Sequence, residues 1–447
     1  MNELSKDFEV IIKSFLKSIS PSEIFKEKVL INKNQIKIED KTFPLNEFEK
    51  IYVIGFGKAS SAMATEIEKY LLDKIEDGIV ITKYGFKTET KKIKVFEAGH
   101  PLPDENSIKY SLDVLNLLSK TKENDLVICL ISGGGSSLFE VPVDGIDLIT
   151  LQELNDYLIK RKIPIHRINS FRKAFSKVKG GKLLEYIYPS TCLSFVISDV
   201  IGDDLSVIAS GPTYLAAKKI YIDNKDTLEV EKILHHKDEV IKIEQLIKSQ
   251  SFPEEIISYY NSKVHNFIVA SNKTAVERSI EISKQLGYEI FACKYDLLMS
   301  VEELASHFIN EFLSLNQTQG YFKKIIVYGC ETFLEVKGSG KGGRNLHLLL
   351  TILNELIKNK IKPNFNFFIS SFATDGNDGN TDSAGAFINN QILEKVKLST
   401  FSPEVYLQNF DSYNFFKNFN CLINTGPTFT NVADLFICLA CSTEKQS

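Results

Sequence analysis

Short apolar runs alternate with longer segments of helical spacing between residues 50 and 210. The strand-like runs lie at 51–57, 77–85, 92–99 and 126–131, and the helical segments at 58–75 and 107–120. An alternation of strands and helices predicts a mostly parallel sheet with helices on both faces. We therefore expect an N-terminal α/β domain with a doubly wound, Rossmann-like sheet.

A second series of strand-like runs follows a densely charged stretch at 214–260. These runs lie at 264–270, 288–296, 323–330 and 366–376. They predict a second α/β unit. We expect the first domain to span 1–234 and the second to span 235–447. The charged stretch is more typical of a solvated helix or linker than of a binding surface.

The first twenty residues interleave charges with apolar side chains. Phe8, Ile11, Ile12, Phe15 and Ile19 recur at helical spacing. This pattern predicts an amphipathic helix and not a signal peptide. The chain contains no run of 18 apolar residues, so we expect no transmembrane helix.

The composition is that of an ordinary globular protein. The 447 residues, 43% of them hydrophobic, are too many for one core. A formal net charge of −4 argues against nucleic acid or a membrane surface as the main partner. The seven cysteines are scattered, which predicts a reducing, cytoplasmic compartment. Cys438 and Cys441 have CxxC spacing but lack the second pair or the histidines of a metal site.

Two glycine-rich turns follow strands in the first domain. The run at 126–131 ends in six small residues, Ser132, Gly133, Gly134, Gly135, Ser136 and Ser137. The turn at 55–60 holds Lys58 at a helix start. Such turns bring backbone N–H groups close to an anion, and a helix start favours negative charge. Both turns are candidate phosphate or carboxylate sites.

A basic segment follows at 169–181. Arg172, Ser176 and Lys179 are spaced to share one face of a helix, with Asn169 before them and a double glycine after them. This arrangement suits a polyphosphate, although a solvated basic helix fits the spacing equally well.

Acidic turns provide the complementary chemistry. Asp199 and Asp203 follow a strand, and the turn at 374–382 holds Asp375, Asp378 and Asp382. Closely spaced carboxylates bind Mg²⁺ and accept a hydroxyl proton, although helix-capping aspartates also occur in such turns. A calcium loop is excluded at 374–382 because its twelfth position holds Ala386.

A further glycine-rich stretch at 338–345 carries Lys341, Arg344 and Asn345. Cations and amides beside acidic turns are what phosphoryl transfer requires. The sequence therefore favours a kinase over a hydride-transfer enzyme.

The ordered motif set resembles the class II glycerate 2-kinases, whose C-terminal domain is called MOFRL. The matching motifs are GFGKAS (55–60), AGHPLPDENS (98–107), LISGGGSSL (130–138), NSFRKAFSKVKGGKL (169–183), ISDVIGDDLSVIASGPT (197–213), GSGKGGRN (338–345), TDGNDGNTDSAGA (374–386) and DSYNFF…TGPTFTNVADL (411–435). They occur in family order over nearly the whole chain. On this resemblance the MOFRL-like core spans about 320–435.

The resemblance implies ATP-dependent phosphorylation of D-glycerate at the 2-hydroxyl, giving 2-phosphoglycerate and ADP. It implies an active site in the cleft between the two domains, with ATP and Mg²⁺ as cofactors and D-glycerate as partner, in a monomer or homodimer. Lys58, Asp199 and Arg344 would be catalytic. Residues 132–137 with Asn169, Arg172, Lys179 and Asn345 would bind substrate or phosphate, and Asp199, Asp203, Asp375 and Asp378 would hold the metal.

Two alternatives remain. One is an NAD(P)H-dependent hydroxypyruvate reductase, which the sequence disfavours because Ser60 occupies the third glycine position of a dinucleotide turn. The other is a non-catalytic protein that binds glycerate or nucleotide.

Overall fold

The computed structural model describes residues 3–160, 165–215 and 252–442. They form two compact units. A parallel-sheet unit comprises Ile24–Ile197 and Asp203–Val269, and a mixed-sheet unit comprises Met1–Glu23, Ser198–Gly202 and Ala270–Ser447. This division differs from the expected one at residue 234, because the N-terminal helix belongs with the C-terminal unit and the strand at 264–270 belongs mainly with the first. Most of the charged stretch at 214–260 lies outside the described residues.

The parallel-sheet unit contains a six-stranded sheet of order β6-β5-β4-β7-β8-β9. Its strands are β4 (Ile51–Phe56), β5 (Ile75–Lys83), β6 (Ile93–Ala98), β7 (Leu126–Ser132), β8 (Thr191–Ile197) and β9 (Val264–Ala270). The pairings from β6 to β8 are parallel, and β4 and β7 are buried along their whole length. The order reverses between β4 and β7. In doubly wound folds ligands bind beyond the carboxyl ends of the strands at such a reversal.

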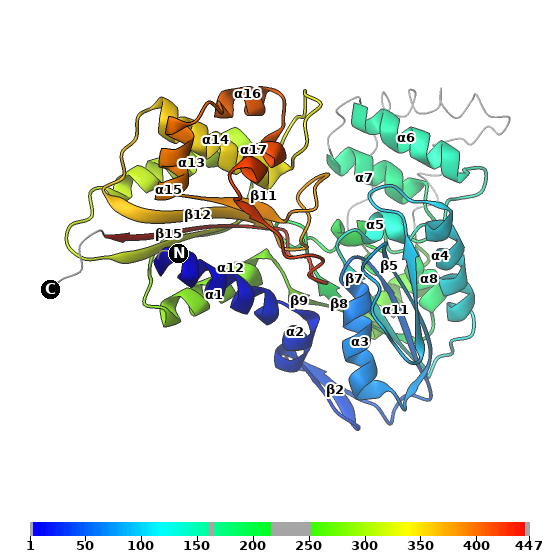
Figure 1. The fold of residues 1–447 in the computed structure, drawn as a ribbon. Coiled ribbons are helices and arrows are strands. Elements are labelled where there is room, and N and C mark those ends of the chain that lie inside the picture. Colours follow the sequence, from blue (N-terminus) through cyan, green and yellow to red (C-terminus); the bar gives the residue numbers. More distant parts are fainter. Residues whose placement is uncertain (1–2, 161–164, 216–251, 443–447) are drawn as a thin grey trace. The chain divides into compact units, whose positions relative to one another are not determined.

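Helices and a small antiparallel sheet complete this unit (Figure 1). The helices are α3 (Ser60–Leu71), α4 (Glu105–Leu118), α5 (Gly135–Leu138), α6 (Leu148–Lys160), α7 (Ile165–Ala174), α8 (Leu183–Ile187) and α11 (Glu254–Lys263), with a 3-10 turn, η1, at Ile208–Ser210. The small sheet consists of β1 (Val29–Ile31), β2 (Gln35–Ile38) and β3 (Lys41–Pro44). The alternation of strand and helix predicted at 51–132 is confirmed.

The mixed-sheet unit is built on a sheet of order β10-β11-β15-β12-β13-β14. Its strands are β10 (Glu289–Ser300), β11 (Lys323–Phe333), β12 (Phe365–Ala373), β13 (Gly385–Asn389), β14 (Leu422–Ile423) and β15 (Asp434–Ser442). Only the β10–β11 pairing is parallel among these described strands. The last described strand, β15, lies between β11 and β12, at the centre of the sheet.

Helices cover both faces of the mixed sheet (Figure 1). They are α1 (Glu3–Ser18), α12 (Asn272–Gln285), α13 (Val301–Leu315), α14 (Arg344–Lys358), α15 (Asn390–Leu398), α16 (Pro403–Gln408) and α17 (Ser412–Asn418), while α2 (Pro21–Lys28) spans the division between the units. Successive side chains of β12 point to opposite faces of the sheet, as in any β-strand. Phe365 and Phe367 join the core that contains α13 and α14, whereas Phe368 stacks on Phe8 of α1 at 4.5 Å. The predicted amphipathic helix is thus confirmed, and its partner is the mixed sheet.

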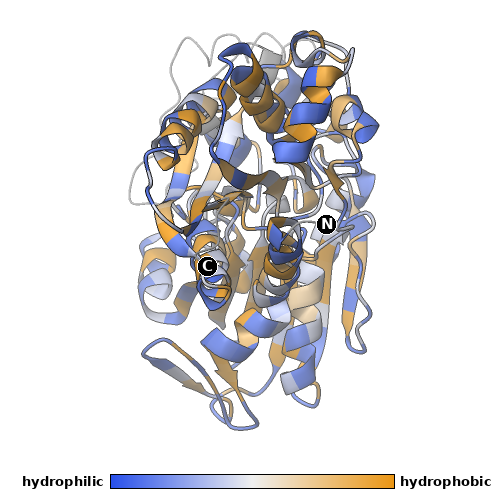
Figure 2. Cartoon of the chain, turned by 60° about the vertical axis from the view of Figure 1, so that its left-hand side comes forward, coloured by the Kyte–Doolittle hydropathy of each residue, from blue (hydrophilic) through white to orange (hydrophobic). Residues whose placement is uncertain are grey.

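The hydropathy of the chain follows this layering. Apolar residues gather on the strands, while the helices carry both apolar and polar sides (Figure 2). Among the described residues, each helix is too short or too polar to cross a bilayer. Cys438 and Cys441 both lie on β15, and residues three apart on a strand point to opposite faces, so they form no CxxC pair.

Candidate functional site

The carboxyl ends of β4 and β7 meet at the reversal of the parallel sheet. Phe56 pairs with Ile131 in parallel register, so the two glycine-rich turns that follow are neighbours. The Lys58 N–H donates to the Gly133 carbonyl at 2.9 Å, and the Ala59 N–H donates to the Ser132 Oγ at 2.9 Å. These bonds hold the two turns together as one structure.

Two glycines are required for this close approach. Gly57 has φ +130°, and a Cβ there would lie 2.2 Å from the Ser132 Oγ. Gly134 has φ +83°, and its Cβ would lie 2.9 Å from the His100 ring and 3.4 Å from the Lys58 Cγ. The half-buried Lys58 side chain therefore lies against the glycine loop, next to His100. An ammonium there adds positive charge beside the glycine loop.

The serines of the loop have different uses. Ser132 accepts the Ala59 N–H, and the Ser137 Oγ donates to the Gly134 carbonyl at 3.2 Å, so both hydroxyls serve the turns. The half-buried Ser136 instead bonds the hydroxyl of Ser210 at 2.8 Å. The Ser136 hydroxyl therefore links the glycine loop to the loop that contains Ser210.

That neighbouring loop has a strained backbone. Ala209 and Ser210 have φ of 49° and 64°, values that L residues rarely adopt. The Gly180 N–H donates to the Ser210 carbonyl at 2.9 Å, and the Gly181 N–H to the Gly211 carbonyl at 2.7 Å. The double glycine of the basic segment thus reaches the glycine loop through residues 208–211. Strained residues held by several bonds are frequent at functional sites.

The predicted helical face of the basic segment is wrong. Helix α7 ends at Ala174, so Ser176 and Lys179 lie beyond it. The chain leaves the helix because the Lys177 N–H donates to the Val141 carbonyl at 2.7 Å, in a bridge between Pro142 and Ser176. Asn169 remains on α7 and is half-buried.

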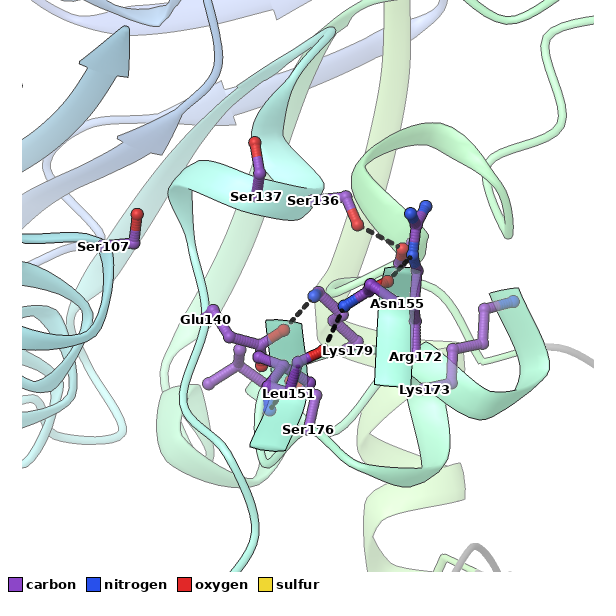
Figure 3. A network of polar contacts seen from close by, with 12 residues as sticks. Ser107, Ser136, Ser137, Glu140, Leu151, Asn155, Arg172, Lys173, Ser176 and Lys179 are labelled. Carbon is purple, nitrogen blue, oxygen red and sulfur yellow. Dashed lines mark hydrogen bonds and ion pairs between the residues drawn. The ribbon is translucent and has the colours of Figure 1, made fainter. Parts of the chain in front are cut away.

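Lys179 forms a buried ion pair with Glu140. The two side chains are 3% and 2% exposed. Burial lowers the pKa of the Lys179 ammonium, and Glu140 partly offsets this effect. A buried charge requires a partner. The ammonium that the sequence suggests for phosphate is therefore engaged inside the fold, as Figure 3 shows.

We expect Lys179→Met to destabilise the protein by about 3–5 kcal/mol, because Glu140 would remain buried without a counter-charge. The double variant Lys179→Met/Glu140→Leu should recover most of that loss. Urea denaturation measures both. Lys177→Met is the matched control, since its partner Asp144 is 96% exposed and the pair should contribute under about 1 kcal/mol. A similar small loss for Lys179→Met would contradict the ion-pair interpretation.

Arg172, unlike Lys179, lies on α7. Its Nε donates to the Asn155 Oδ1 at 2.8 Å. Burial lowers the pKa of the guanidinium, which still remains charged because arginine titrates far above neutral pH. Its tip and the Ser136 hydroxyl point toward the same region in Figure 3. Arg172 thus keeps a cation near the glycine loop where Lys179 does not.

In the mixed-sheet unit, Arg344 occupies the first position of α14. Its Nη1 donates to the Glu331 Oε1 at 2.7 Å, and its Nε lies 2.5 Å from the Asp434 Oδ2. Both carboxylates raise the pKa of Arg344, and burial raises that of Asp434, whose side chain is 2% exposed. The Arg344 side chain as a whole is one-third exposed. Two carboxylates therefore fix its orientation while part of it stays accessible.

Asp378 caps the N-terminus of α14. Its carboxylate accepts the Leu346 N–H at 2.8 Å, the Asn345 N–H at 3.1 Å and the Asn345 Nδ2 at 3.2 Å. A Cβ on Gly343 would lie 2.3 Å from its Cγ. Burial raises the pKa of Asp378 to about 7, although these N–H bonds act to lower it. Asp378 and the buried Asn345 are thus used to begin the helix.

The raised pKa of Asp378 predicts a pH dependence of stability. The native carboxyl holds its proton up to about pH 7 and the unfolded one only to about pH 4. The free energy of unfolding should therefore fall as pH rises from about 4 to 7, by at most about 1.4 kcal/mol per pH unit. Asp378→Asn should flatten that slope, measured by urea denaturation at several pH values.

Asp382→Asn is the control for this titration. It is an exposed carboxyl in the same turn, and its pKa is lowered by the Tyr413 hydroxyl and by Lys341. Ionised Asp382 therefore stabilises the folded protein, and this stabilisation is lost as pH falls. Its contribution to the slope of stability against pH has the opposite sign to that of Asp378. An unchanged slope in Asp378→Asn would contradict the assignment.

The glycines at 338–342 serve packing. A Cβ on Gly338 or Gly340 would lie 2.4 or 2.5 Å from the Asn409 carbonyl oxygen, and one on Gly342 would lie 2.4 Å from the Ser412 Oγ. Lys341 lies 3.9 Å from the centre of the Tyr413 ring. The stretch is therefore pressed against residues 409–412.

The remaining aspartates are divided between the units. Asp199 accepts the Asn431 Nδ2 at 2.9 Å, and the buried Asp375 accepts the Asn377 N–H at 3.0 Å, both in the mixed-sheet unit. Asp203 belongs to the parallel-sheet unit, and its Oδ1 is buried with no hydrogen-bond partner among the described residues. Over 3–160, 165–215 and 252–442, no three carboxylate, histidine or cysteine side chains gather as a metal cage.

Comparisons with known proteins match this chain over nearly its full length. A family model described as a domain of unknown function, DUF4147, matches residues 7–243, and the MOFRL family model matches 324–434. A glycerate 2-kinase of Pyrococcus horikoshii is 36% identical over 96% of this chain and 95% of its own length. A crystal structure of glycerate kinase from Thermotoga maritima aligns with a TM-score of 0.79 at 32% identity, covering 98% of this chain and 99% of its own. The chain belongs to the glycerate kinase family.

Within this glycerate kinase family member, the geometry adds residues that the sequence did not single out. They share a contact with a predicted site residue: His100, Glu140, Asn155, Ser210, Glu331, Asn431 and Asp434. His100, Ser210 and Glu331 lie close to the motif glycines and cations in sequence, so motif context could have suggested them. Asn431 and Asp434 lie within the motif that ends at 435 and could have been suggested in the same way. Glu140 and Asn155 carry no local signal, because only the fold brings them to their partners.

Proposed function

We propose that this chain is an ATP-dependent glycerate kinase that transfers the γ-phosphoryl group of ATP to the 2-hydroxyl of D-glycerate. The near-full-length similarity to a glycerate 2-kinase, 36% identical over 96% of the chain, carries the proposal. The loops at the ends of β4 and β7 support it, since backbone N–H groups and an ammonium suit an anionic substrate.

Cations have the central roles in this proposal. Lys58 and Arg344 stabilise the negative charge that develops on the transferred phosphoryl group, and residues 133–136 with Arg172 bind a carboxylate or phosphate. Both catalytic cations are held by their surroundings, Lys58 against Gly134 and Arg344 by Glu331 and Asp434. A fixed cation costs little reorganisation during the reaction.

Asp199 is the proposed base. The 2-hydroxyl loses its proton to a carboxylate oxygen of Asp199 while its oxygen forms the new bond to phosphorus and ADP leaves. The Asn431 Nδ2 donates to the Asp199 Oδ2 at 2.9 Å, which orients the carboxylate.

Mg²⁺ would arrive with ATP. It would neutralise phosphate charge, and because this ion keeps several waters and needs only one or two carboxylates, the absence of a dedicated cage among the described residues is compatible with it. Asp199, Asp203 and Asp375 are the proposed ligands. Asp378 is a poorer one, because its oxygens already accept three N–H bonds.

A reductase is less well supported. The Ser60 Oγ donates to the Gly57 carbonyl at 2.7 Å, so the third position of the turn carries a bonded side chain where a dinucleotide turn has glycine.

The test is a product-resolved kinase assay. The purified protein is incubated with ATP, Mg²⁺ and D-glycerate, and 2- and 3-phosphoglycerate are distinguished by NMR. We expect 2-phosphoglycerate and an equal amount of ADP. Formation of 3-phosphoglycerate would overturn the regiochemistry, and glycerate-independent or absent ADP formation would overturn the kinase.

A further inference from the structure

A buried amide on α6 touches the cation on α7. The Asn155 side chain is 7% exposed, accepts from the Arg172 Nε at 2.8 Å and donates from its Nδ2 to the Leu151 carbonyl at 2.9 Å. Arginine has only donors and a carbonyl only acceptors, so one amide orientation alone satisfies both partners. The Asn155 oxygen is therefore fixed toward the guanidinium.

The surroundings make this amide unexpected. The helices α6 and α7 otherwise meet through an apolar cluster that includes Leu151, Leu154, Ile168 and Phe171. A buried amide is costly unless it is bonded, and an apolar side chain would pack there at least as well. What Asn155 adds to this contact is a fixed guanidinium.

The neighbouring charged residues leave the Arg172 guanidinium available to bind an anion. Lys179 already neutralises Glu140 beneath it, and among the described residues no carboxylate lies within ion-pair distance of Arg172. The bond to Asn155 uses only the Nε–H, so within the part of the chain that the structure describes the two terminal nitrogens keep their four N–H donors. Ser136 and Ser210 bring two hydroxyls from the glycine loop and η1, and η1 also contacts α7.

We propose that Asn155 is a positioning residue, which holds Arg172 so that its terminal nitrogens bind an oxyanion beside Ser136 and Ser210. The oxyanion is the carboxylate of glycerate or a phosphate of ATP, since a planar guanidinium pairs with either in two-point fashion. The inference rests on the proposed function for the identity of the ligand, and on the geometry for the role of Asn155.

The experiment is a double-mutant cycle in the full chain. Asn155→Leu should raise the KM of one substrate about 10-fold, with kcat within about twofold, because a charge-assisted contact is no longer held in place. Arg172→Gln should raise the same KM about 100-fold. The double variant should match Arg172→Gln alone, because Asn155 acts only through that arginine. A raised KM for glycerate identifies the carboxylate, and one for ATP identifies the phosphate.

Asn390→Leu is the matched control. Its amide also makes two hydrogen bonds, but among the described residues both go to backbone groups, those of Phe365 and Phe367. It should lower the melting temperature and leave both KM values unchanged, whereas Asn155→Leu should change KM without a comparable loss of melting temperature. Additive effects in the double variant, or unchanged KM values in Asn155→Leu, would overturn the positioning role.

The two proposals fail separately. If the wild-type protein transfers no phosphate to glycerate, the proposed function is wrong. Calorimetric titration of the same variants with D-glycerate and with ATP then still tests the positioning role, with Kd in the place of KM. Equal Kd values for wild type and Asn155→Leu would overturn it.

Discussion

Replacing Arg344 by Gln is expected to lower kcat by about 10²- to 10³-fold, measured as ADP formation at saturating glycerate and ATP. The Arg344 side chain is one-third exposed, and its guanidinium is held by two carboxylates, at 2.7 Å from Glu331 and 2.5 Å from Asp434. A cation held in this way stabilises developing phosphoryl charge without reorganising. Glutamine retains hydrogen-bonding capacity but removes the charge, so the loss should appear in kcat more than in KM.

Stability has to be separated from catalysis in this variant. Arg344→Gln leaves Asp434 buried beside an uncharged partner, which also destabilises the fold. Arg344→Gln/Asp434→Asn removes both charges, and should recover melting temperature without recovering kcat. Lys341→Gln is the control, because Lys341 lies three residues earlier and rests on the Tyr413 ring. If the double variant regains activity, Arg344 acts only on the fold.

Much of the fold could be predicted because its strands have distinct patterns. Buried parallel strands such as β4 and β7 are continuous apolar runs between turns, and the helices between them show helical periodicity. Pairing between distant segments has no such signal. The last strand, β15, lies in the centre of the mixed sheet, and α1 packs on the same sheet through Phe8.

The candidate site could be predicted in its motifs but not in the use of each residue. The glycine stretches at 132–135 and 338–343 look alike in sequence. In the first, glycines bring Lys58 against the backbone, while in the second they admit the carbonyl of Asn409 and the hydroxyl of Ser412. Composition cannot distinguish a loop that approaches a ligand from one that approaches its own chain.

Charged residues raise the same difficulty. Lys179 has a sequence context like that of Arg172, but it is buried on Glu140, whereas the Arg172 Nε donates to the amide oxygen of Asn155. Asp378 resembles a metal ligand in a turn rich in aspartates, but caps α14. A charge that balances another charge and one that serves a ligand differ only in their three-dimensional neighbours.

Replacing Lys58 by Met is expected to lower kcat/KM by about 10²- to 10³-fold, because one cation is lost at the loops beyond β4 and β7. The fold should be retained, since the turn is tied by backbone and serine groups: the Lys58 N–H bonds Gly133 and the Ala59 N–H bonds Ser132. Steady-state kinetics and thermal unfolding, measured on the same preparation, check both halves of this expectation.

The control for Lys58 is a lysine at the opposite end of the same strand. Lys50 is exposed, pairs with Glu76 at 2.7 Å and directly precedes β4, so Lys50→Met should leave kcat/KM within about twofold and change stability by under about 1 kcal/mol. If Lys58→Met behaved like Lys50→Met, the ammonium beside Gly134 would have no part in the reaction. If it instead lost its melting temperature together with its activity, the side chain would support the turn, and the anion would be held by the backbone N–H groups of the glycine loop alone.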